Sequence, residues 1–297
     1  MTVIVASAAL DFGSSSKGAV MIVITGATGN VGRPLVRMLS DRGEQVTATA
    51  RAISVADVPP GVTVRRVDLT VPSTVSPAIA GAEAVFLLTP TDMHAEDGQA
   101  FRALIDAVRG AGVARVVLLS SQGVATGRHP AVLEDIVRQS GLGWTILRPG
   151  GFASNALWWA EGVRRQRVIA APFADVGLPV IDPADIAAVA AVCLRRAGHE
   201  SQTYVLTGPE PITPRQQAAA ISNALGGAPI EFVEQTRAQA MAELQRVMPP
   251  VVAERTLDAL GAPTPEEQQV PQDLPRVLGR NAAPFAQWVS RHVDAFR

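Results

Sequence analysis

The sequence predicts an α/β fold with a doubly wound parallel sheet, and three observations support that prediction. From Met21 onward, short apolar strands alternate with amphipathic helical stretches at the spacing of βαβ units. The strands are nearly continuous apolar runs, which is typical of strands that are buried on both faces of a parallel sheet. The first strand runs directly into a glycine-rich turn that opens a helix. This last arrangement is typical of a Rossmann dinucleotide-binding unit.

The glycine-rich turn lies within residues 21–32, which read MIVITGATGNVG. Gly26 permits the tight turn, Gly29 lets the backbone approach a pyrophosphate, and Gly32 lets the helix pack closely against the strand. The N–H groups and the positive dipole end of that helix favour a phosphate. Taken alone, the three glycines also fit an ordinary strand–helix turn, although the spacing G-x-x-G-x-x-G is typical of short-chain dehydrogenases. The turn residues predicted to bind the cofactor are Gly26, Thr28, Gly29, Asn30 and Val31.

Length, charge and composition exclude several classes of protein. The chain has 297 residues, enough for one large or two small domains. Its net charge of −1 gives no basic surface for nucleic acid, and no apolar run reaches the roughly 20 residues that span a bilayer. The single cysteine, Cys193, excludes an internal disulfide, and the four histidines show no metal-ligand spacing. We therefore expect a soluble cytoplasmic protein without a metal, a nucleic-acid partner or a membrane; the oligomeric state is not predicted.

The chain is expected to have three parts. Residues 1–20 are predicted to be a disordered leader. They do not resemble a signal peptide, because their positive charge, Lys17, follows the apolar stretch instead of preceding it. Residues 21–150 are predicted to form the dinucleotide-binding Rossmann domain. Residues 151–297 are predicted to form a smaller α+β lobe that binds the substrate and completes the fold.

The elements expected in each part follow from the apolar pattern and from the residues that cap helices. Strands are expected at 21–24, 45–50, 62–67, 84–88, 115–119, 144–147, 203–206 and 230–234. Helices are expected at 30–42, 94–109, 131–140, 152–165, 182–196 and 213–225, with further helices from 236 onward.

Two strand ends indicate which cofactor binds, because ligands of such sheets lie outside the carboxyl ends of the strands. The second strand ends at Arg51, where NAD-selective proteins carry an acid for the ribose 2′-hydroxyl. A guanidinium there attracts a 2′-phosphate and forks onto it, which favours NADP(H), although a solvated arginine would look the same. Asp68 ends the third strand, where it could accept a hydrogen bond from the adenine amine or simply form a turn.

Further site residues are predicted from the remaining strand ends and from the aromatic stretch beyond the sixth strand. The additional residues predicted to bind the cofactor are Leu69, Thr89, Pro90, Ser120, Ser121, Pro149, Gly150 and Phe152. The residues predicted to line the substrate pocket are Phe152, Asn155, Trp158 and Trp159, for which a role in the core is an equal alternative.

Several stretches together resemble the NmrA-like branch of the atypical short-chain dehydrogenases. They are the loop TGATGNVG, Arg51, WTILRPGGFASN at 144–155, IDPADIAAV at 181–189, TYVLTG at 203–208 and FAQWVSRHVDAF at 285–296. The resemblance extends from Met21 to the C-terminus. It implies a Rossmann fold with an NADP(H) site, in a branch that contains NADPH-dependent quinone and isoflavone-type reductases as well as regulators that bind the dinucleotide without turnover.

The chain departs from the family at the catalytic Tyr-x-x-x-Lys pair, in which the lysine lowers the pKa of the tyrosine that exchanges the proton. Its single tyrosine, Tyr204, falls in a late strand, and its single lysine, Lys17, precedes the fold. By position, His129 stands near the expected tyrosine and Leu133 near the expected lysine. An imidazole can act as a general acid, so His129 is the candidate catalytic residue. The sequence GRHP is also typical of the start of a helix, which favours solvent as the proton donor.

Three functions remain consistent with these residues. The first is an NADPH-dependent reductase of a quinone- or enone-like small molecule, whose extended π-system accepts negative charge and demands less of a protein acid. The second is an NADP(H)-binding sensor or regulator without turnover. The third is a cofactor-assisted isomerase or lyase of a biosynthetic pathway. The sequence favours the reductase and does not identify its substrate.

Overall fold

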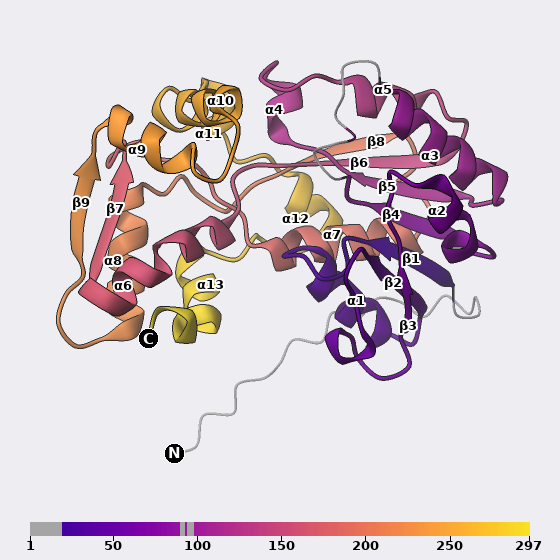
Figure 1. Ribbon diagram of the computed structural model, residues 1–297, viewed down its shortest axis with the longest axis horizontal. Coiled ribbons are helices and arrows are strands. Elements are labelled where there is room, and N and C mark those ends of the chain that lie inside the picture. Colours follow the sequence, from indigo (N-terminus) through magenta and orange to yellow (C-terminus); the bar gives the residue numbers. More distant parts are fainter. Residues whose placement is uncertain (1–19, 90–92, 94–97) are drawn as a thin grey trace.

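A computed structural model describes residues 20–89, 93 and 98–297 of the chain. The predicted leader, apart from Val20, lies outside these residues, as does Pro90. Seven parallel strands form the main sheet in the order β3–β2–β1–β4–β5–β6–β8 (Figure 1). Their bounds are Met21–Thr25 for β1, Gln45–Ala50 for β2, Thr63–Arg66 for β3, Ala84–Leu87 for β4, Arg115–Leu119 for β5, Gly143–Pro149 for β6 and Gln202–Leu206 for β8. The predicted doubly wound parallel sheet is confirmed.

Helices cover both faces of this sheet, and each face has its own apolar core. Alternation along β1 divides its side chains between the cores: Ile22 and Ile24 face one of them and Val23 faces the other. The first core contains the buried faces of α1 (Gly32–Ser40) and α7 (Pro183–Arg195). The opposite core contains residues of α2 (Pro72–Ile79), α3 (Gln99–Gly110) and α5 (Val132–Arg138).

A second lobe lies beside the main sheet and is built around a third core. Within that core Phe285 stacks on Trp288 with 5.6 Å between the ring centroids. The strands of the lobe, β7 (Val168–Pro172) and β9 (Glu231–Gln235), form a parallel pair. Its helices are η3 (Ala153–Trp159), α6 (Ala160–Gln166), α8 (Pro214–Leu225), α9 (Arg237–Leu244), α10 (Pro250–Gly261), α11 (Pro265–Gln268), α13 (Phe285–His292) and η4 (Val293–Phe296).

The chain beyond residue 150 also contributes to the main sheet. Strand β8 pairs with β6, and the helix α12 (Asp273–Leu278) caps that edge, since Asp273 accepts a hydrogen bond from the backbone N–H of Val205 at 2.8 Å. At the start of α7, the buried Asp182 pairs with Arg291, and the buried Asp185 pairs with Arg280 at 2.6 Å. These ion pairs attach the C-terminal segment to the main sheet. The division expected at residue 150 stays a prediction.

Some elements differ from those expected. Part of the predicted helix at 152–165 is a 3₁₀ turn, η3, which begins with an i to i+3 hydrogen bond from Asn155 N to Phe152 O at 3.0 Å. The pattern also gave no sign of β7 or of α2. Strand β7 is short, and its partner β9 lies far along the chain, with Val168 paired to Glu231. The short elements not yet named are η1 (Val55–Asp57) and α4 (Gln122–Ala125).

Candidate functional site

The turn after β1 lies where the strand order reverses between β1 and β4, which is where ligands of doubly wound sheets bind. The hydroxyl of Thr25 fixes this point: its Oγ1 donates to Phe86 O at 3.0 Å and accepts from Leu88 N at 2.7 Å. Gly26 follows with a φ of +62°. A Cβ on Gly26 would lie 2.4 Å from Cδ2 of Leu88. Only glycine therefore suits this position.

The helix α1 approaches the turn so closely that Gly32 has no room for a side chain. A Cβ there would lie 2.1 Å from the carbonyl oxygen of Gly26, and a Cβ on Gly29 would lie 3.2 Å from the same atom. The backbone N–H groups of Thr28, Asn30 and Val31 have no acceptor among the residues that the structure describes. A cradle of glycines with unpaired N–H groups at a helix N-terminus is what a pyrophosphate requires. The turn therefore fits a dinucleotide.

The side chain of Asn30 reaches the second lobe. Its Nδ2 donates to the Oγ of Ser154 at 3.0 Å, and Ser154 is buried in η3. The predicted phosphate turn is thus attached directly to the lobe that was predicted to bind the substrate.

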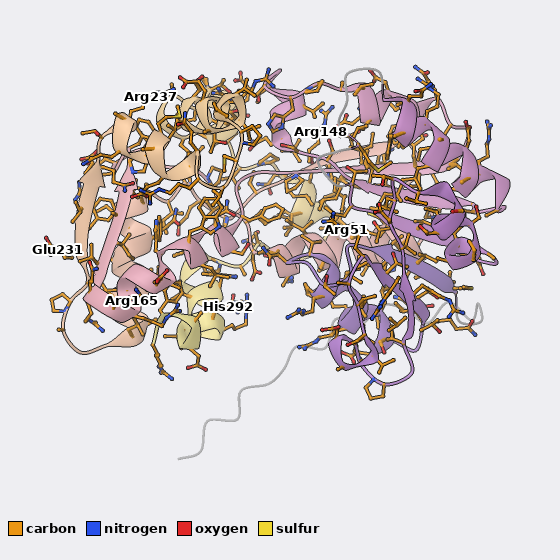
Figure 2. All side chains as sticks on the ribbon, in the orientation of Figure 1. Arg51, Arg148, Arg165, Glu231, Arg237 and His292 are labelled. Atoms are coloured by element: carbon orange, nitrogen blue, oxygen red, sulfur yellow. The ribbon has the colours of Figure 1, made fainter. Side chains whose placement is uncertain are left out.

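The carboxyl ends of β2 and β3 bring Arg51 and Asp68 near one another, and Figure 2 shows Arg51 on the side of the main sheet that faces the second lobe. Arg51 is exposed. Asp68 Oδ1 accepts from the hydroxyl of Thr70 at 2.7 Å and from its backbone N–H at 3.0 Å. These bonds, with a smaller contribution from the charge of Arg51, lower the pKa of Asp68. Asp68 therefore forms a turn of its own, whereas Arg51 is an exposed guanidinium after β2, and its contact with a 2′-phosphate stays a prediction.

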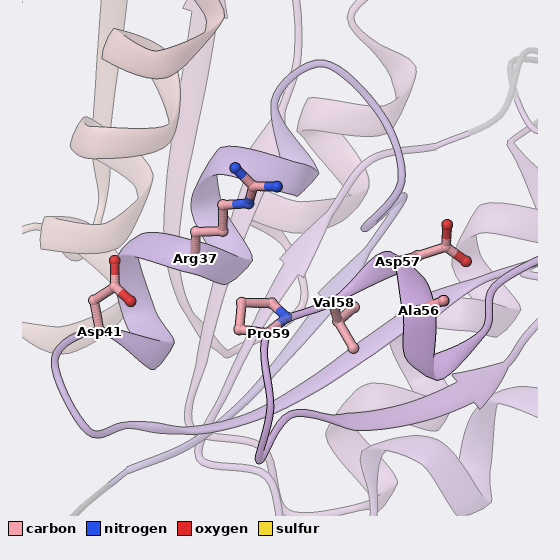
Figure 3. A pocket seen from close by; sticks show the side chains of 6 residues that line it. All are labelled: Arg37, Asp41, Ala56, Asp57, Val58 and Pro59. Carbon is pink, nitrogen blue, oxygen red and sulfur yellow. The ribbon is translucent and has the colours of Figure 1, made fainter.

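A hollow of about 300 Å³ lies on the outer side of α1, between that helix and η1 (Figure 3). Arg37 of α1 and Asp41, the residue directly after α1, line it on one side, and residues 56–59 line it on the other. None of the predicted site residues lines this hollow. The glycine turn lies at the other end of α1, so this hollow is separate from the phosphate cradle.

The ends of β5 and β6 are joined by a buried carboxylate, that of Glu134 in α5, which is 1% exposed. Ser120 donates to Glu134 Oε1 at 2.6 Å. Arg148 forks onto both oxygens at 2.9 and 2.6 Å, and Arg138 adds a contact at 2.7 Å. Burial opposes ionisation of Glu134, but the hydrogen bonds and the charges of the two arginines outweigh it, so its pKa lies below the ordinary value. Glu134 is therefore a fixed anion.

The next residue, Ser121, contacts the candidate catalytic residue. Its Oγ lies 3.1 Å from Nδ1 of His129 and also accepts from the backbone N–H of Gly123 at 3.1 Å, which caps α4. His129 is exposed. The structure therefore brings together two of the predicted site residues, Ser121 and His129, in one hydrogen bond.

The loop that carries His129 is held by hydrogen bonds to residues of the second lobe. Arg128 forks onto Glu267 of α11 at 2.5 and 2.9 Å and also donates to Ala262 O at 2.8 Å. Thr126 donates to Glu267 at 3.0 Å, and the amide of Gln122 donates to Glu266 O at 3.3 Å. Nothing in the sequence had indicated Glu134 or Glu267, because each partner lies far along the chain or on another element.

The predicted pocket residues beyond β6 do not share one environment. Phe152 is half-buried against the core of the main sheet and forms a bridge with Ile181, whereas Trp159 packs against the core of the second lobe. Asn155 is exposed, and Trp158 is 63% exposed. Their contact with a substrate stays a prediction.

The remaining predicted cofactor residues lie at the carboxyl ends of strands, as expected. Gly150 donates its N–H to Leu206 O at 2.9 Å, and a Cβ there would lie 3.0 Å from Oε1 of Gln122. Pro149 is buried at the end of β6. Leu69 and Thr89 are half-buried after β3 and β4. The placement of Thr89, Pro149 and Gly150 is compatible with a cofactor that extends from the glycine turn toward β5 and β6, whereas Leu69 lies on the β3 side, next to Asp68.

The only tyrosine of the chain, Tyr204, takes no part in this site. It lies on β8, and its hydroxyl is 2.8 Å from Nδ1 of His199. Among the residues that the structure describes, no group of three or more His, Cys, Asp or Glu side chains is arranged to hold a metal. No helix in the described part of the chain is long and apolar enough to cross a membrane.

A doubly wound sheet with a glycine cradle at its switch point defines a dinucleotide-binding α/β protein. The chain belongs to the NAD(P)H-binding family, whose model matches residues 26–197. The expectation of an NAD(P)H cofactor is thereby confirmed.

Relatives of similar length place the chain more closely. It is 35% identical over 284 residues to a reductase of (4-alkanoyl-5-oxo-2,5-dihydrofuran-3-yl)methyl phosphate from Streptomyces griseus, which covers 93% of this chain and 99% of the relative. It is 32% identical over 286 residues to an NAD(P)H azoreductase of Xenophilus azovorans, with the same coverage.

Solved structures agree. The quinone oxidoreductase QOR2 of Escherichia coli in complex with NADPH is 27% identical, with 92% of this chain and 99% of that chain covered and a TM-score of 0.76. By fold alone, the chain is also similar to the negative transcriptional regulator NmrA, with 19% identity, coverage of 93% and 96%, and a TM-score of 0.72. The expected membership of the NmrA-like branch is confirmed.

The close approach at Gly32 generates the first prediction. We expect Gly32→Ala to abolish NADPH binding and to lower the free energy of unfolding by about 1–3 kcal/mol, because its Cβ collides with backbone that cannot move aside. Cofactor titration and denaturant unfolding measure both effects. Gly110→Ala, at the end of α3 where a Cβ meets nothing within 4 Å, is the control and should change neither quantity adversely. Unchanged NADPH affinity in Gly32→Ala would contradict the assignment of the cradle.

Arg51 generates the second prediction. We expect the protein to prefer NADPH over NADH, and Arg51→Ala to remove most of that preference while NADH affinity stays the same. One charge-assisted contact contributes about 1.5–3 kcal/mol, or roughly tenfold to a hundredfold in affinity. Dissociation constants for both cofactors measure the ratio. Arg109→Ala, which removes an equal charge from the exposed end of α3, should leave the ratio unaltered. Equal affinities of the unmutated protein for NADPH and NADH would refute the role of Arg51.

Glu134 generates the third prediction. Because its pKa is lowered in the folded state, its stabilisation is present above the ordinary value of 4.5 and is lost as the pH falls below it. We expect Glu134→Gln to lower the free energy of unfolding by on the order of 3 kcal/mol at pH 7, with a smaller difference from the unmutated protein in acid. Urea unfolding at several pH values tests this. Glu231→Gln, at an exposed position of β9, is the control. A difference that grows on acidification would contradict the assignment.

Proposed function

We propose that this protein is an NADPH-dependent reductase that transfers hydride to a quinone- or enone-like small molecule without a Tyr-x-x-x-Lys pair. The observation that carries the proposal is the arrangement at the carboxyl ends of β5 and β6. With the phosphate cradle at the turn after β1 and Arg51 on the β2 side, a nicotinamide would extend in the other direction, over β4 and β5. Ser120, Ser121 and His129 follow β5 at that place.

The nature of the acceptor follows from what the site contains. Hydride addition to an isolated carbonyl produces a localised alkoxide, which short-chain dehydrogenases protonate with their tyrosine. Hydride addition to a quinone or to a conjugated carbonyl produces an anion that is delocalised over the π-system. The hydroxyl of Ser121 and the imidazole of His129 are adequate for such an anion. The names of the relatives support this class, since they describe an oxo-dihydrofuran, an azo compound and a quinone as acceptors.

A non-catalytic NADP(H) sensor is the second candidate, favoured by the missing phenol–amine pair and by the shared fold of NmrA. The two functions differ in turnover, since both require the same cradle and the same Arg51. Binding of NADPH alone therefore does not distinguish them.

The fourth prediction separates the two functions. The purified protein is incubated with NADPH and a panel of 1,4-quinones, α,β-unsaturated lactones and azo dyes, and nicotinamide absorbance is followed. We expect oxidation of NADPH with at least one conjugated class and none with saturated ketones, because only the conjugated acceptors delocalise the charge. Tight NADPH binding without oxidation by any member of the panel would favour the sensor instead.

A further inference from the structure

We propose that Ser121 and His129 form a proton relay. In this relay Ser121 donates its proton to the reduced acceptor, and His129 reprotonates Ser121 with a proton that comes from solvent. The proposal rests on the reductase function proposed above. It assigns the catalytic hydroxyl to Ser121, and it replaces the missing tyrosine by a hydroxyl whose proton supply comes from an imidazole.

The two adjacent serines at the end of β5 have opposite hydrogen-bonding capacity. Ser120 gives its only proton to Glu134 at 2.6 Å, and a carboxylate held by two arginines does not return it. Ser120 therefore offers only lone pairs to a ligand. Ser121 has no such commitment, because its contact with Nδ1 of His129 runs in either direction, depending on where the imidazole carries its proton. Of the two hydroxyls, Ser121 is the one that can donate to a ligand.

The position of His129 is built into the backbone of its loop. The N–H groups of Arg128 and His129 both donate to the carbonyl of Gly123, at 2.8 and 2.9 Å. The imidazole lies directly against Gly123, where a Cβ would be 2.6 Å from Nδ1. Glycine at 123 is thus what lets the ring reach Ser121. Arg128, the residue before His129, forms an ion pair with Glu267 of α11 at 2.5 Å.

Protons and electrons balance in the relay. As the acceptor takes hydride from NADPH, its oxygen or nitrogen forms a bond to the Ser121 proton, and the O–H bond of Ser121 breaks. The Nδ1–H bond of a protonated His129 then breaks and restores the hydroxyl. Neutral His129 takes a new proton from solvent, to which its side chain is exposed. One NADPH and one solvent proton are consumed for each acceptor reduced.

The relay differs from the sequence-based expectation that solvent donates the proton directly. The sequence GRHP places His129 shortly before α5, where a polar residue is common. The distance of His129 from the hydroxyl of Ser121 depends on the turn between α4 and α5. Solvent remains the ultimate source of the proton, but the proposed relay places Ser121 and His129 between solvent and the acceptor.

The test uses substitutions that separate the relay from helix capping, since Ser121 also caps α4. Ser121→Asn keeps a good capping oxygen but has no hydroxyl, whereas Ser121→Thr keeps both. We expect Ser121→Asn and His129→Gln each to lower kcat by about a hundredfold or more with an unchanged dissociation constant for NADPH. Ser121→Thr should retain most of kcat. The double variant should be no slower than either single variant, because the two residues act as a unit.

A second readout does not depend on turnover. Nitrogen-15 NMR of the His129 ring in the cofactor-free protein should show an Nδ1 shift that changes in Ser121→Asn and is retained in Ser121→Thr. If the unmutated protein oxidises NADPH with a conjugated acceptor while Ser121→Asn and His129→Gln keep most of kcat, the relay is wrong and the reductase function stands. Loss of NADPH binding in Ser121→Asn, or failure of Ser121→Thr to restore kcat, also overturns the relay. If no acceptor is reduced by the unmutated protein, the reductase function itself fails, and the relay fails with it.

Discussion

The close approach of α1 to the end of β1 is the constraint on which the rest of the structure depends. The absence of side chains at Gly26 and Gly32 lets the helix start within contact distance of the strand. That position leaves N–H groups of the turn unpaired, and it lets α1 pack against α7 in the core of the same face. Since α7 comes from residues beyond 150 and is tied to the C-terminal segment through Asp182 and Asp185, the phosphate turn and the chain terminus belong to one packed unit.

The main sheet was predictable because its signal is local. The bounds of β2 and β5 were predicted to the residue. In β5 the signal is the apolar run VVLL, which is typical of a parallel strand buried on both faces. The glycine turn and Arg51 were identifiable for the same reason, as each residue type is required by the backbone or by the chemistry at its own position. The lobe was less predictable: β7 has only two buried side chains, Ile169 and Ala171, and depends on β9, whose residues are more than 60 positions away.

The positions of the candidate site residues were predictable from the sequence, but their hydrogen-bond and ion-pair partners were not. Ser120 and Ser121 were selected because they follow a strand, and His129 because it stands near the position of the expected tyrosine, but the pattern of apolar residues reports burial and not pairing. Glu134 follows Leu133, the residue aligned with the missing lysine, and it reads as an ordinary acid near the start of a helix. Only the fold reveals that it receives four hydrogen bonds from β5, β6 and its own helix. In the same way, nothing local indicates that Arg128 and Glu267, 139 positions apart, are partners.

These connections separate two carboxylates whose charges are fixed from the Ser121–His129 pair, to which the relay proposed above assigns the proton transfer. The pKa values of Glu134 and Glu267 are both lowered, because their bonds to arginine outweigh the cost of burial. Both carboxylates therefore stay ionised throughout the range in which an imidazole titrates. Ser120 then keeps one hydrogen-bond direction at every physiological pH, and the loop around His129 keeps one position. The hydrogen bond between Ser121 and His129 differs from these contacts, because it can run in either direction, depending on the imidazole tautomer. In the proposed relay, Glu134 and Glu267 therefore hold the surrounding elements in place while Ser121 and His129 move the proton.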